Sequence, residues 1–396
     1  MMPTFLTRWR VLATMLMFVI ASATSAARAV EHNFAGSVQL DQHFVPTASP
    51  ADARRLGFAG FTLEAAGKLA VDFSERVSAN VKVCFGCHGF ETDMAHFDYR
   101  ASDGFRVRFG RMSPTFGLFN LRHDPANHKL SSKPLPYDMG RMLRHRAWNQ
   151  GVLPSPFPDN GVEISGAHAG EAVTLEYAAH AVSGMKADAR ALDLDFVQSR
   201  TGGLYYVDNN ALPTVGGRVA ANVRLAPKVE LGAGASGLVG TFDPNNERTY
   251  AVLGGDLALR IGRTQLRAEY LLRRQEFDTS EPSRFKYVLS PRGEFFVKHG
   301  AYAEIEQPLS SSVDAVLRVD GMMRVGNLER PPPLDPAPEG ELSRRSSVGR
   351  VTVGSVWAVD AALRLKTSVE VTHFSDRDLA GRRDAVGVHV AGVGTF

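Results

Sequence analysis

Two cysteines and a histidine lie within five residues of one another. Cys84 and Cys87 are the only cysteines among 396 residues, and His88 directly follows the second. C-x-x-C-H attaches c-type haem: each thiol adds across one vinyl group of the porphyrin, and the adjacent imidazole binds the iron. We therefore predict one covalent haem c at 84–88, with His88 as the proximal ligand. A Cys84–Cys87 disulfide, a metal site and a chance pair remain open alternatives.

The sequence around the motif alternates like a β-strand, which limits how it could hold a haem. Lys82 and Cys84 share one face of the expected strand, and we expect that face to line the lumen of a barrel. Residues three apart in a flat strand point to opposite faces, so Cys84 and Cys87 could not both reach one porphyrin. We therefore expect 84–90 to leave the sheet as a tight external turn, using the freedom of its glycines.

The iron would take a second axial ligand from a nearby histidine or methionine, or remain five-coordinate. The candidates by position are Met94, His96, His123 and His128. Two arginines, Arg106 and Arg108, are candidate partners of the haem propionates, because a guanidinium group suits carboxylates.

The N-terminus indicates export. Arg8 and Arg10 precede an apolar run of about a dozen residues that ends in Ala27-Arg28-Ala29, the pattern of a secretory signal peptide. We expect residues 1–29 to be removed and 30–396 to form the mature protein. The alternative is a buried or anchoring N-terminal helix.

The mature sequence is dominated by a period of two. In 104–111 the apolar Phe105, Val107 and Phe109 alternate with Arg106 and Arg108, so one face of the segment is apolar and the other polar. Eighteen such segments can be counted, among them 189–198 and 203–208. The pattern at 203–208 is weak, and without this segment and one neighbour the count is sixteen.

Three features favour a transmembrane barrel over a soluble all-β protein. Many segments have the nine to twelve residues of a tilted membrane-crossing strand, and short turns alternate with longer polar loops. The last segment ends on Phe396, as in bacterial outer-membrane proteins. We therefore predict a 16- to 18-strand barrel in the outer membrane of a Gram-negative bacterium. An even strand count places both termini in the periplasm.

The alternation of side chains along the strands places a set of basic residues inside the barrel. They are Arg106, Arg108, Arg218, Arg224, Arg318, Arg364 and Lys366. Such a lumen would favour anions, although Asp314, Asp320 and Glu370 lie on the same faces. The long segment 113–160 is expected to be an external loop that folds into the lumen as a constriction. A net charge of +3 is too small to indicate a nucleic-acid partner.

With its motif and its barrel pattern, the chain resembles fused monohaem cytochrome-porins, through Cys84, Cys87 and His88. The segment G-R-M-S-P-T-F-G at 110–117 is similar to phosphate-selective porins. In the fused family the motif lies close to the mature N-terminus, whereas here it lies about 55 residues into the mature chain. The resemblance implies electron transfer across the outer membrane, between a periplasmic soluble cytochrome and an external donor or acceptor such as iron.

The competing interpretation is a passive diffusion porin that prefers anions and carries a Cys84–Cys87 disulfide. No acid–base or nucleophile pattern accompanies the cysteines, so an electron carrier or porin is favoured over a classical enzyme. Outer-membrane lipid is an expected partner in either case. A homotrimer is a further expectation, because trimers are common among porins.

Overall fold

The computed structural model describes residues 30–45, 60–86, 89–138, 151–186, 208, 210–276, 295–326, 345–375 and 384–396. The predicted signal peptide and two residues of the motif, Cys87 and His88, lie outside the described residues. Among the described residues, no helix is long and apolar enough to cross a membrane.

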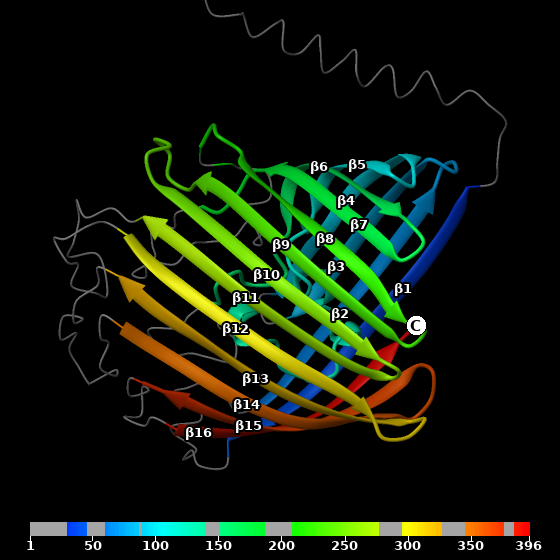
Figure 1. Ribbon diagram of the computed structural model, residues 1–396, viewed down its shortest axis with the longest axis vertical. Helices are drawn as coiled ribbons and strands as arrows, with labels where there is room; N and C mark the ends of the chain where they lie inside the picture. Colours follow the sequence, from blue (N-terminus) through cyan, green and yellow to red (C-terminus); the bar gives the residue numbers. More distant parts are fainter. Residues whose placement is uncertain are drawn as a thin grey trace, which may run out of the picture.

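Sixteen antiparallel strands form one closed barrel, in which each strand pairs with its neighbours in sequence and β1 pairs with β16 (Figure 1). The strands are β1 (Glu31–Phe44), β2 (Gly60–Asp72), β3 (Val77–Gly86), β4 (Gly89–Ser102), β5 (Phe105–Met112), β6 (Asp159–Ala169), β7 (Val173–Val182), β8 (Thr214–Ala226), β9 (Val229–Thr241), β10 (Thr249–Ile261), β11 (Thr264–Glu276), β12 (Phe295–Pro308), β13 (Val313–Gly326), β14 (Arg345–Ala358), β15 (Leu363–Phe374) and β16 (Asp384–Thr395). The predicted fold class is therefore confirmed.

The barrel has the smaller of the two predicted strand counts. β7 pairs directly with β8, from Val173 opposite Val223 to Val182 opposite Thr214. The segments 189–198 and 203–208 therefore supply no strand to the wall; apart from Asp208 they lie outside the described residues. The count of eighteen is wrong, because alternation over a few residues in a loop is indistinguishable from a short strand.

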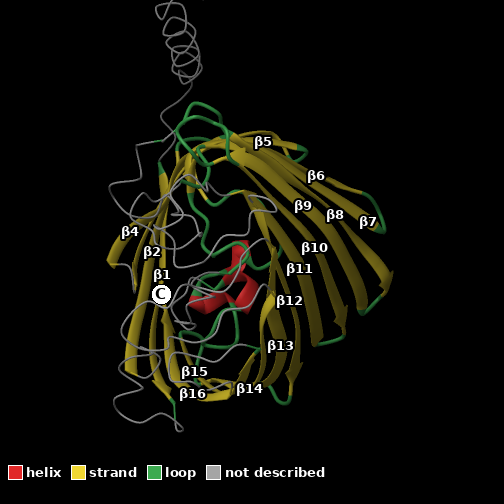
Figure 2. Ribbon diagram, turned by 90° about the vertical axis from the view of Figure 1, so that its left-hand side faces the viewer, coloured by secondary structure: helices red, strands yellow, loops and turns green. Residues whose placement is uncertain are grey.

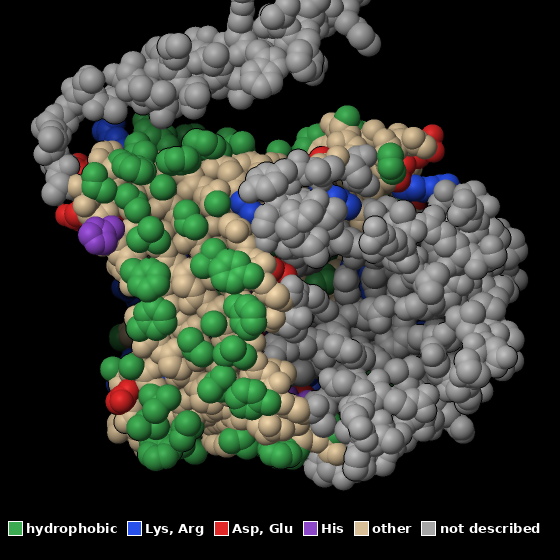
Figure 3. Space-filling view, turned by 180° about the vertical axis from the view of Figure 1, so that it is seen from behind, with side chains coloured by type: hydrophobic (Ala, Val, Ile, Leu, Met, Phe, Trp, Pro, Cys, Tyr) green, Lys and Arg blue, Asp and Glu red, His purple; other side chains and the backbone are tan. Residues whose placement is uncertain are grey.

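The two faces of each strand differ in chemistry. Along β15, Leu365, Val369 and Val371 are exposed on the outside, while Lys366 and Glu370 are buried on the inside. Apolar side chains likewise cover much of the described outer surface on the face shown in Figure 3. An apolar outer band around a polar interior is the arrangement that a bilayer requires of a spanning barrel.

Most of the exposed aromatic side chains of the described residues lie near one of the two rims of the barrel. Phe44, Phe61, Phe85 and Phe90 lie at the end of the barrel that carries most of the longer loops, and Phe73, Tyr99, Phe105, Tyr177, Trp357 and Phe396 lie at the end with the short turns. Two aromatic belts of this kind flank the apolar band of membrane barrels, at the level of the lipid headgroups.

The last residue closes the barrel. The backbone of Phe396 exchanges two hydrogen bonds with that of Gly36, at 2.9 and 3.1 Å, and its ring lies 5.5 Å from the ring of Phe34. A side chain at position 36 would collide with the Phe396 ring. This pairing leaves the sheet without a free edge at its seam.

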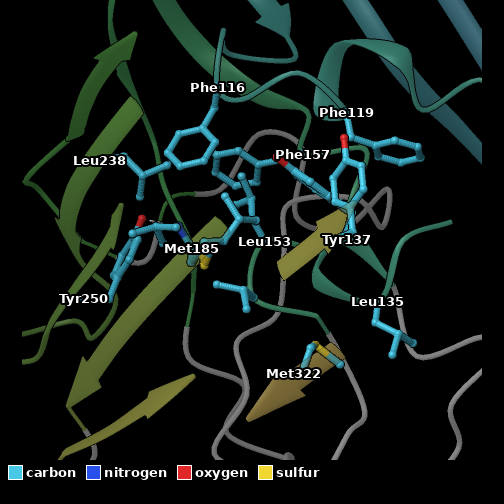
Figure 4. Packing of buried hydrophobic residues seen from close by; sticks show 14 of the residues in the cluster. Phe116, Phe119, Leu135, Tyr137, Leu153, Phe157, Met185, Leu238, Tyr250 and Met322 are labelled. Atoms are coloured by element: carbon cyan, nitrogen blue, oxygen red, sulfur yellow. Dashed lines mark hydrogen bonds between the residues drawn. The ribbon is translucent and has the colours of Figure 1, made fainter. Parts of the chain in front are cut away.

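The segment between β5 and β6 lies inside the barrel, where Figure 2 shows its short helices surrounded by strands. It contains three 3-10 helices, η1 (Asn120–Arg122), η2 (Pro125–Asn127) and η3 (Leu135–Tyr137). We call residues 113–138 and 151–158, its described part, the inner loop. Phe116, Tyr137 and Phe157 of the inner loop belong to one buried apolar cluster with the wall residues Leu238, Tyr250 and Met322 (Figure 4). Part of the lumen is therefore filled by an apolar core.

Candidate functional site

A buried carboxylate on β11 holds the start of the inner loop. Glu269 accepts hydrogen bonds from the backbone N–H groups of Leu118 and Phe119, at 3.0 and 2.7 Å. It also accepts the hydroxyl hydrogens of Tyr137 and Tyr302, both at 2.5 Å. Four donors thus satisfy a side chain that is only 3% exposed, which is what a buried carboxylate requires.

Gly117 permits this close approach. Its φ of +58° lies in the left-handed region, which side chains other than glycine rarely adopt. A Cβ atom at this position would lie 2.3 Å from the Tyr137 hydroxyl and 2.5 Å from the carboxylate of Glu269. The loop can therefore reach Glu269 because residue 117 has no side chain.

Wall cations bind the backbone further along the inner loop. Arg318 donates to the carbonyl oxygen of Ser132 at 3.0 Å, and Arg350 donates to that of Lys133 at 2.6 Å. The ammonium group of Lys366 donates to the carbonyl oxygens of Pro125 and His128, at 2.7 and 2.8 Å. These cations therefore neutralise backbone dipoles and nearby acids such as Asp320 and Glu370 instead of facing a water-filled pore.

A second tie joins the inner loop to β3 and β4. The ammonium group of Lys82 lies 2.7 Å from Asp93, 2.5 Å from Asp124 and 3.1 Å from Nε2 of His123. Nδ1 of His123 lies 2.8 Å from the carbonyl oxygen of Asn120, and its Nε2 lies 3.3 Å from Asp93 and from Asp124. The ammonium group of Lys82 and the imidazole therefore share the same two carboxylates. We call these four residues the Lys82 cluster.

The charges of this cluster set the ionisation of its loop carboxylate. Burial alone would raise the pKa of Asp124, but the neighbouring His123 and Lys82 outweigh burial and hold that pKa below its ordinary value. The acid of the loop is therefore ionised at neutral pH and pairs with Lys82.

A β-bulge brings Asp93 into the cluster. Lys82 pairs with Met94 but Val83 pairs with Thr92, so Asp93 is an extra residue on β4. Strict alternation from Phe97 would place Asp93 on the lipid face, whereas it is 2% exposed inside the barrel. Sequence reasoning missed Asp93 for this reason, and no local signal in the sequence marks the bulge.

The described part of the cysteine motif differs from the prediction. Cys84 remains in the sheet opposite Glu91, and the ladder continues to the pair Gly86 and Gly89. The expectation that 84–90 leaves the sheet is therefore wrong for its described residues, 84–86 and 89–90. Within the described residues, which do not include Cys87, Cys84 is a free thiol on the same face as Lys82.

The predicted axial ligands lie at different distances from Cys84. Met94 faces Lys82 across the ladder, and His123 contacts Lys82, two residues from Cys84 on the same face. His96 pairs with Asn80, about 13 Å further down the strand, and its ring nitrogens contact Asp98 and the backbone of Arg111. The structure therefore brings His123 and Met94, more than His96, towards the motif.

His128 lies in the interior of the inner loop. Its Nδ1 lies 2.7 Å from the carbonyl oxygen of Leu130, and its ring is 5.6 Å from that of Phe119. Burial, together with the charge of Lys366, holds the pKa of His128 well below its ordinary value. The imidazole is therefore neutral at pH 7.

The two arginines predicted to pair with propionates lie far from Cys84 along the barrel. Arg108 lies beside Asp98, which in turn pairs with Ser78, about 20 Å along β3 from Cys84. Arg108 is bound to Glu163, and Arg106 lies two residue pairs nearer the turns. The structure does not bring either arginine to the cysteine.

Two cavities lie on the side of the lumen formed by β4–β11. One, of about 320 Å³, lies between the inner loop and β4–β8, and the other, of about 380 Å³, lies along β7–β11. Each is lined by three arginines and two carboxylates. The first set is Arg100, Arg106, Arg218, Asp103 and Glu176, and the second is Arg224, Arg260, Arg267, Glu171 and Glu230.

Comparison with known proteins identifies the fold. No protein-family model and no curated protein matches the chain. Among solved structures, the anion-selective porin of Comamonas acidovorans matches 93% of this chain and 100% of its own, with a TM-score of 0.55 and 11% identity. The outer-membrane channel DcaP of Acinetobacter baumannii matches 94% and 99%, with a TM-score of 0.55 and 9% identity.

OmpT, an outer-membrane protein of Vibrio cholerae, matches 94% of this chain and 99% of its own, with a TM-score of 0.53 and 7% identity. At such identities, similarity establishes the fold alone. The chain has the closed sixteen-strand barrel of the outer-membrane porins.

Proposed function

We propose that this protein is a passive diffusion porin of a Gram-negative outer membrane, which admits small hydrophilic solutes. The observation that carries this proposal is the pair of polar cavities inside a closed barrel with an apolar outer surface. The inner loop fills the other part of the lumen and narrows the path to the side of β4–β11. A restricted aqueous path through a lipid-facing barrel is suited to diffusion of solutes.

The charges along this path favour anions weakly. Arg106, Arg218 and Arg224 line the two cavities, as the proposed preference requires. Three other predicted luminal cations, Arg318, Arg364 and Lys366, donate to carbonyl oxygens of the inner loop instead. Among the side chains that line the second cavity, arginines exceed carboxylates by one, and this excess supports a small anion preference, whereas Arg218 of the first cavity is paired with Asp256.

The first prediction concerns ion conduction. Purified protein added to a planar lipid bilayer should produce discrete conductance steps, because water fills the path beside the inner loop. In a KCl gradient the reversal potential should indicate a chloride permeability about twice that of potassium, and Arg224→Gln should reduce this ratio. Absence of conductance steps from correctly folded, heat-modifiable protein would contradict the porin function.

Assembly as a homotrimer is part of this proposal. One of the similar solved structures is a trimer form of OmpT from Vibrio cholerae. Conductance steps that occur in groups of three, together with the mass of the native complex in detergent, test this point.

A covalent haem remains a second proposal, favoured by the position of Cys84. Its thiol lies on the same face as Lys82, which contacts His123. Because Cys84 stays in the ladder, attachment requires the thiol of Cys87 to reach the same face. A bound haem would supply one-electron chemistry, with Cys84 and Cys87 forming the thioethers and His88 binding the iron.

The second prediction separates this proposal from the plain porin. Protein made in a host with c-type cytochrome maturation should stain for covalent haem and show an α-band on reduction, and Cys87→Ala should lose both signals. The variant should still insert as a heat-modifiable barrel. Absence of stain and α-band from the wild-type protein would eliminate electron transfer and leave the porin proposal intact.

A further inference from the structure

The cavity beside the inner loop has a floor of small side chains. Ser165 and Ala167 of β6 and Ala178 of β7 line it. Arg106 lies opposite Ser165 across the β5–β6 ladder, and Arg218 lies opposite Ala178 across the β7–β8 ladder. Short side chains between two long ones leave the space of about 320 Å³, which lies within the range of small-molecule sites.

One arginine and one hydroxyl of this cavity have unused donors. Within the described residues Arg106 makes no hydrogen bond, and its shortest ion pair is 3.9 Å, to Asp98. The hydroxyl of Ser165, which is 8% exposed, is buried without a hydrogen-bond partner. Arg218, by contrast, donates two bonds to Asp256, at 2.8 and 2.9 Å. Arg106 and Ser165 therefore form one polar corner with the capacity to bind an oxyanion.

A carboxylate lies on the other side of the same floor. Glu176 accepts one bond from the neutral side chain of Asn222, at 3.1 Å. It lies two strands from Arg106 and two residue pairs nearer the turns, which separates their Cα atoms by about 12 Å. Within the described residues the two side chains do not pair with each other, so the cavity presents separate positive and negative ends.

The other charges around the cavity largely cancel. Arg218 is neutralised by Asp256, and Arg100 lies 3.7 Å from Asp103 at the exposed rim. Asp98, the partner of Arg106 at 3.9 Å, is shared with His96 and Asn80, so Arg106 and Glu176 remain the least neutralised charges, one of each sign. Arg106 would attract a simple anion and Glu176 would repel it. A simple cation would be attracted by Glu176 and repelled by Arg106.

We propose that this cavity binds a small zwitterion of the α-amino acid type during its passage through the porin. The carboxylate accepts from the guanidinium of Arg106 and the hydroxyl of Ser165, while the ammonium group lies towards Glu176. Thr115 and Leu121 of the inner loop cover the site from the barrel axis. The proposal rests on the proposed porin function, because the solute reaches this cavity through the lumen.

Calorimetric titration of the purified protein in detergent tests binding without requiring conduction. Three probes of similar size are compared: L-alanine, acetate and methylammonium. Alanine should bind at least about tenfold more tightly than either ion, because only alanine satisfies both ends of the cavity. In bilayers alanine should also reduce the ion current at concentrations where acetate does not.

Matched variants assign the two ends. Arg106→Gln should weaken alanine binding about tenfold, since it removes a charge-assisted contact. Glu176→Gln should weaken alanine binding and strengthen acetate binding, a reversal that a merely structural role would not produce. Arg263→Gln, which removes a cation from an exposed turn whose side chain donates to Ser310, should leave alanine binding within about twofold.

Each contrary outcome has a distinct meaning. Equal binding of acetate and alanine to the wild-type protein, with no reversal in Glu176→Gln, would make the cavity an oxyanion site and overturn the zwitterion proposal. No binding of any probe would also overturn it. Conductance steps without selective block by alanine would support the porin function and contradict the binding of alanine in the conducting path. Alanine binding without conductance would support the zwitterion site and contradict the porin function.

Discussion

Glu269→Ala should release the start of the inner loop from the barrel wall. The substitution removes the carboxylate that accepts four hydrogen bonds. Four buried donors then lack an acceptor: the N–H groups of Leu118 and Phe119 and the hydroxyls of Tyr137 and Tyr302. Each buried donor left unsatisfied costs about 1–3 kcal/mol, so the loss of loop docking should exceed about 3 kcal/mol. Amide hydrogen exchange in residues 113–138 should accelerate by at least about 100-fold.

Two variants define what the acceleration means. Glu269→Gln keeps one acceptor oxygen for Phe119 and Tyr302 but presents an NH2 group to the N–H of Leu118, so its effect should be intermediate. Glu230→Gln changes the same chemical group in an exposed pair with Arg260 near the short turns, and exchange in the inner loop should stay within about twofold of wild type. Unchanged exchange in Glu269→Ala would show that the apolar cluster alone holds the loop.

The barrel itself was predictable from the sequence because its signal is local. Alternation along β15 and β5 assigns the lipid and lumen faces from single segments, since side chains of a strand point to opposite faces in turn. The short turns at 103–104 and 262–263 were also visible as glycine-containing breaks. Strand existence and facing follow from such neighbours in sequence, without knowledge of the rest of the chain.

The contacts of the inner loop depend on residues far apart in sequence. Glu269 lies about 150 residues from Phe119, and Arg350 lies 217 residues from Lys133, so no local pattern joins them. Parity correctly faced Arg318 and Lys366 inward, but it could not show that the loop backbone would use them. These cations therefore face the lumen as predicted, but they bind the inner loop instead of lining an open pore.

At the cysteine motif, the local sequence predicted a departure from the sheet that the structure does not have at Cys84. A five-residue match suggested a departure from the sheet at Cys84, because haem chemistry requires it. Backbone pairing with β4 extends instead to Gly86 and Gly89. The ladder is stabilised by neighbours on both strands, and a motif in one strand gives no information about how far its partner continues.

Lys82→Ala should destabilise the contact between the inner loop and β3–β4 and, in exchange, create a metal site. Without the ammonium group, Asp93 and Asp124 face each other beside His123 with no cation between them, a loss of about 3–5 kcal/mol for a buried ion network. Amide exchange around η1 and the midpoint of thermal unfolding should both report this loss. Lys82→Met should lose the same contact, although its longer side chain partly fills the space.

The three remaining side chains suit a divalent cation. One ligand atom from each of Asp93, His123 and Asp124 lies within 4.8 Å of the others, and the bond from Nδ1 of His123 to Asn120 orients Nε2 towards the centre. Zn²⁺ at about 100 times its dissociation constant should therefore restore about 2.7 kcal/mol to Lys82→Ala. Co²⁺ should give a visible absorption band in that variant.

The wild-type protein should gain nothing from either metal, because Lys82 already occupies the position of the cation. Adding His123→Ala to Lys82→Ala should abolish both the rescue and the cobalt band, since the nitrogen ligand is then absent. If Zn²⁺ stabilised wild type and Lys82→Ala equally, the metal would bind elsewhere. If Lys82→Ala were as stable as wild type without metal, the Lys82 cluster would not be what ties the loop to these strands.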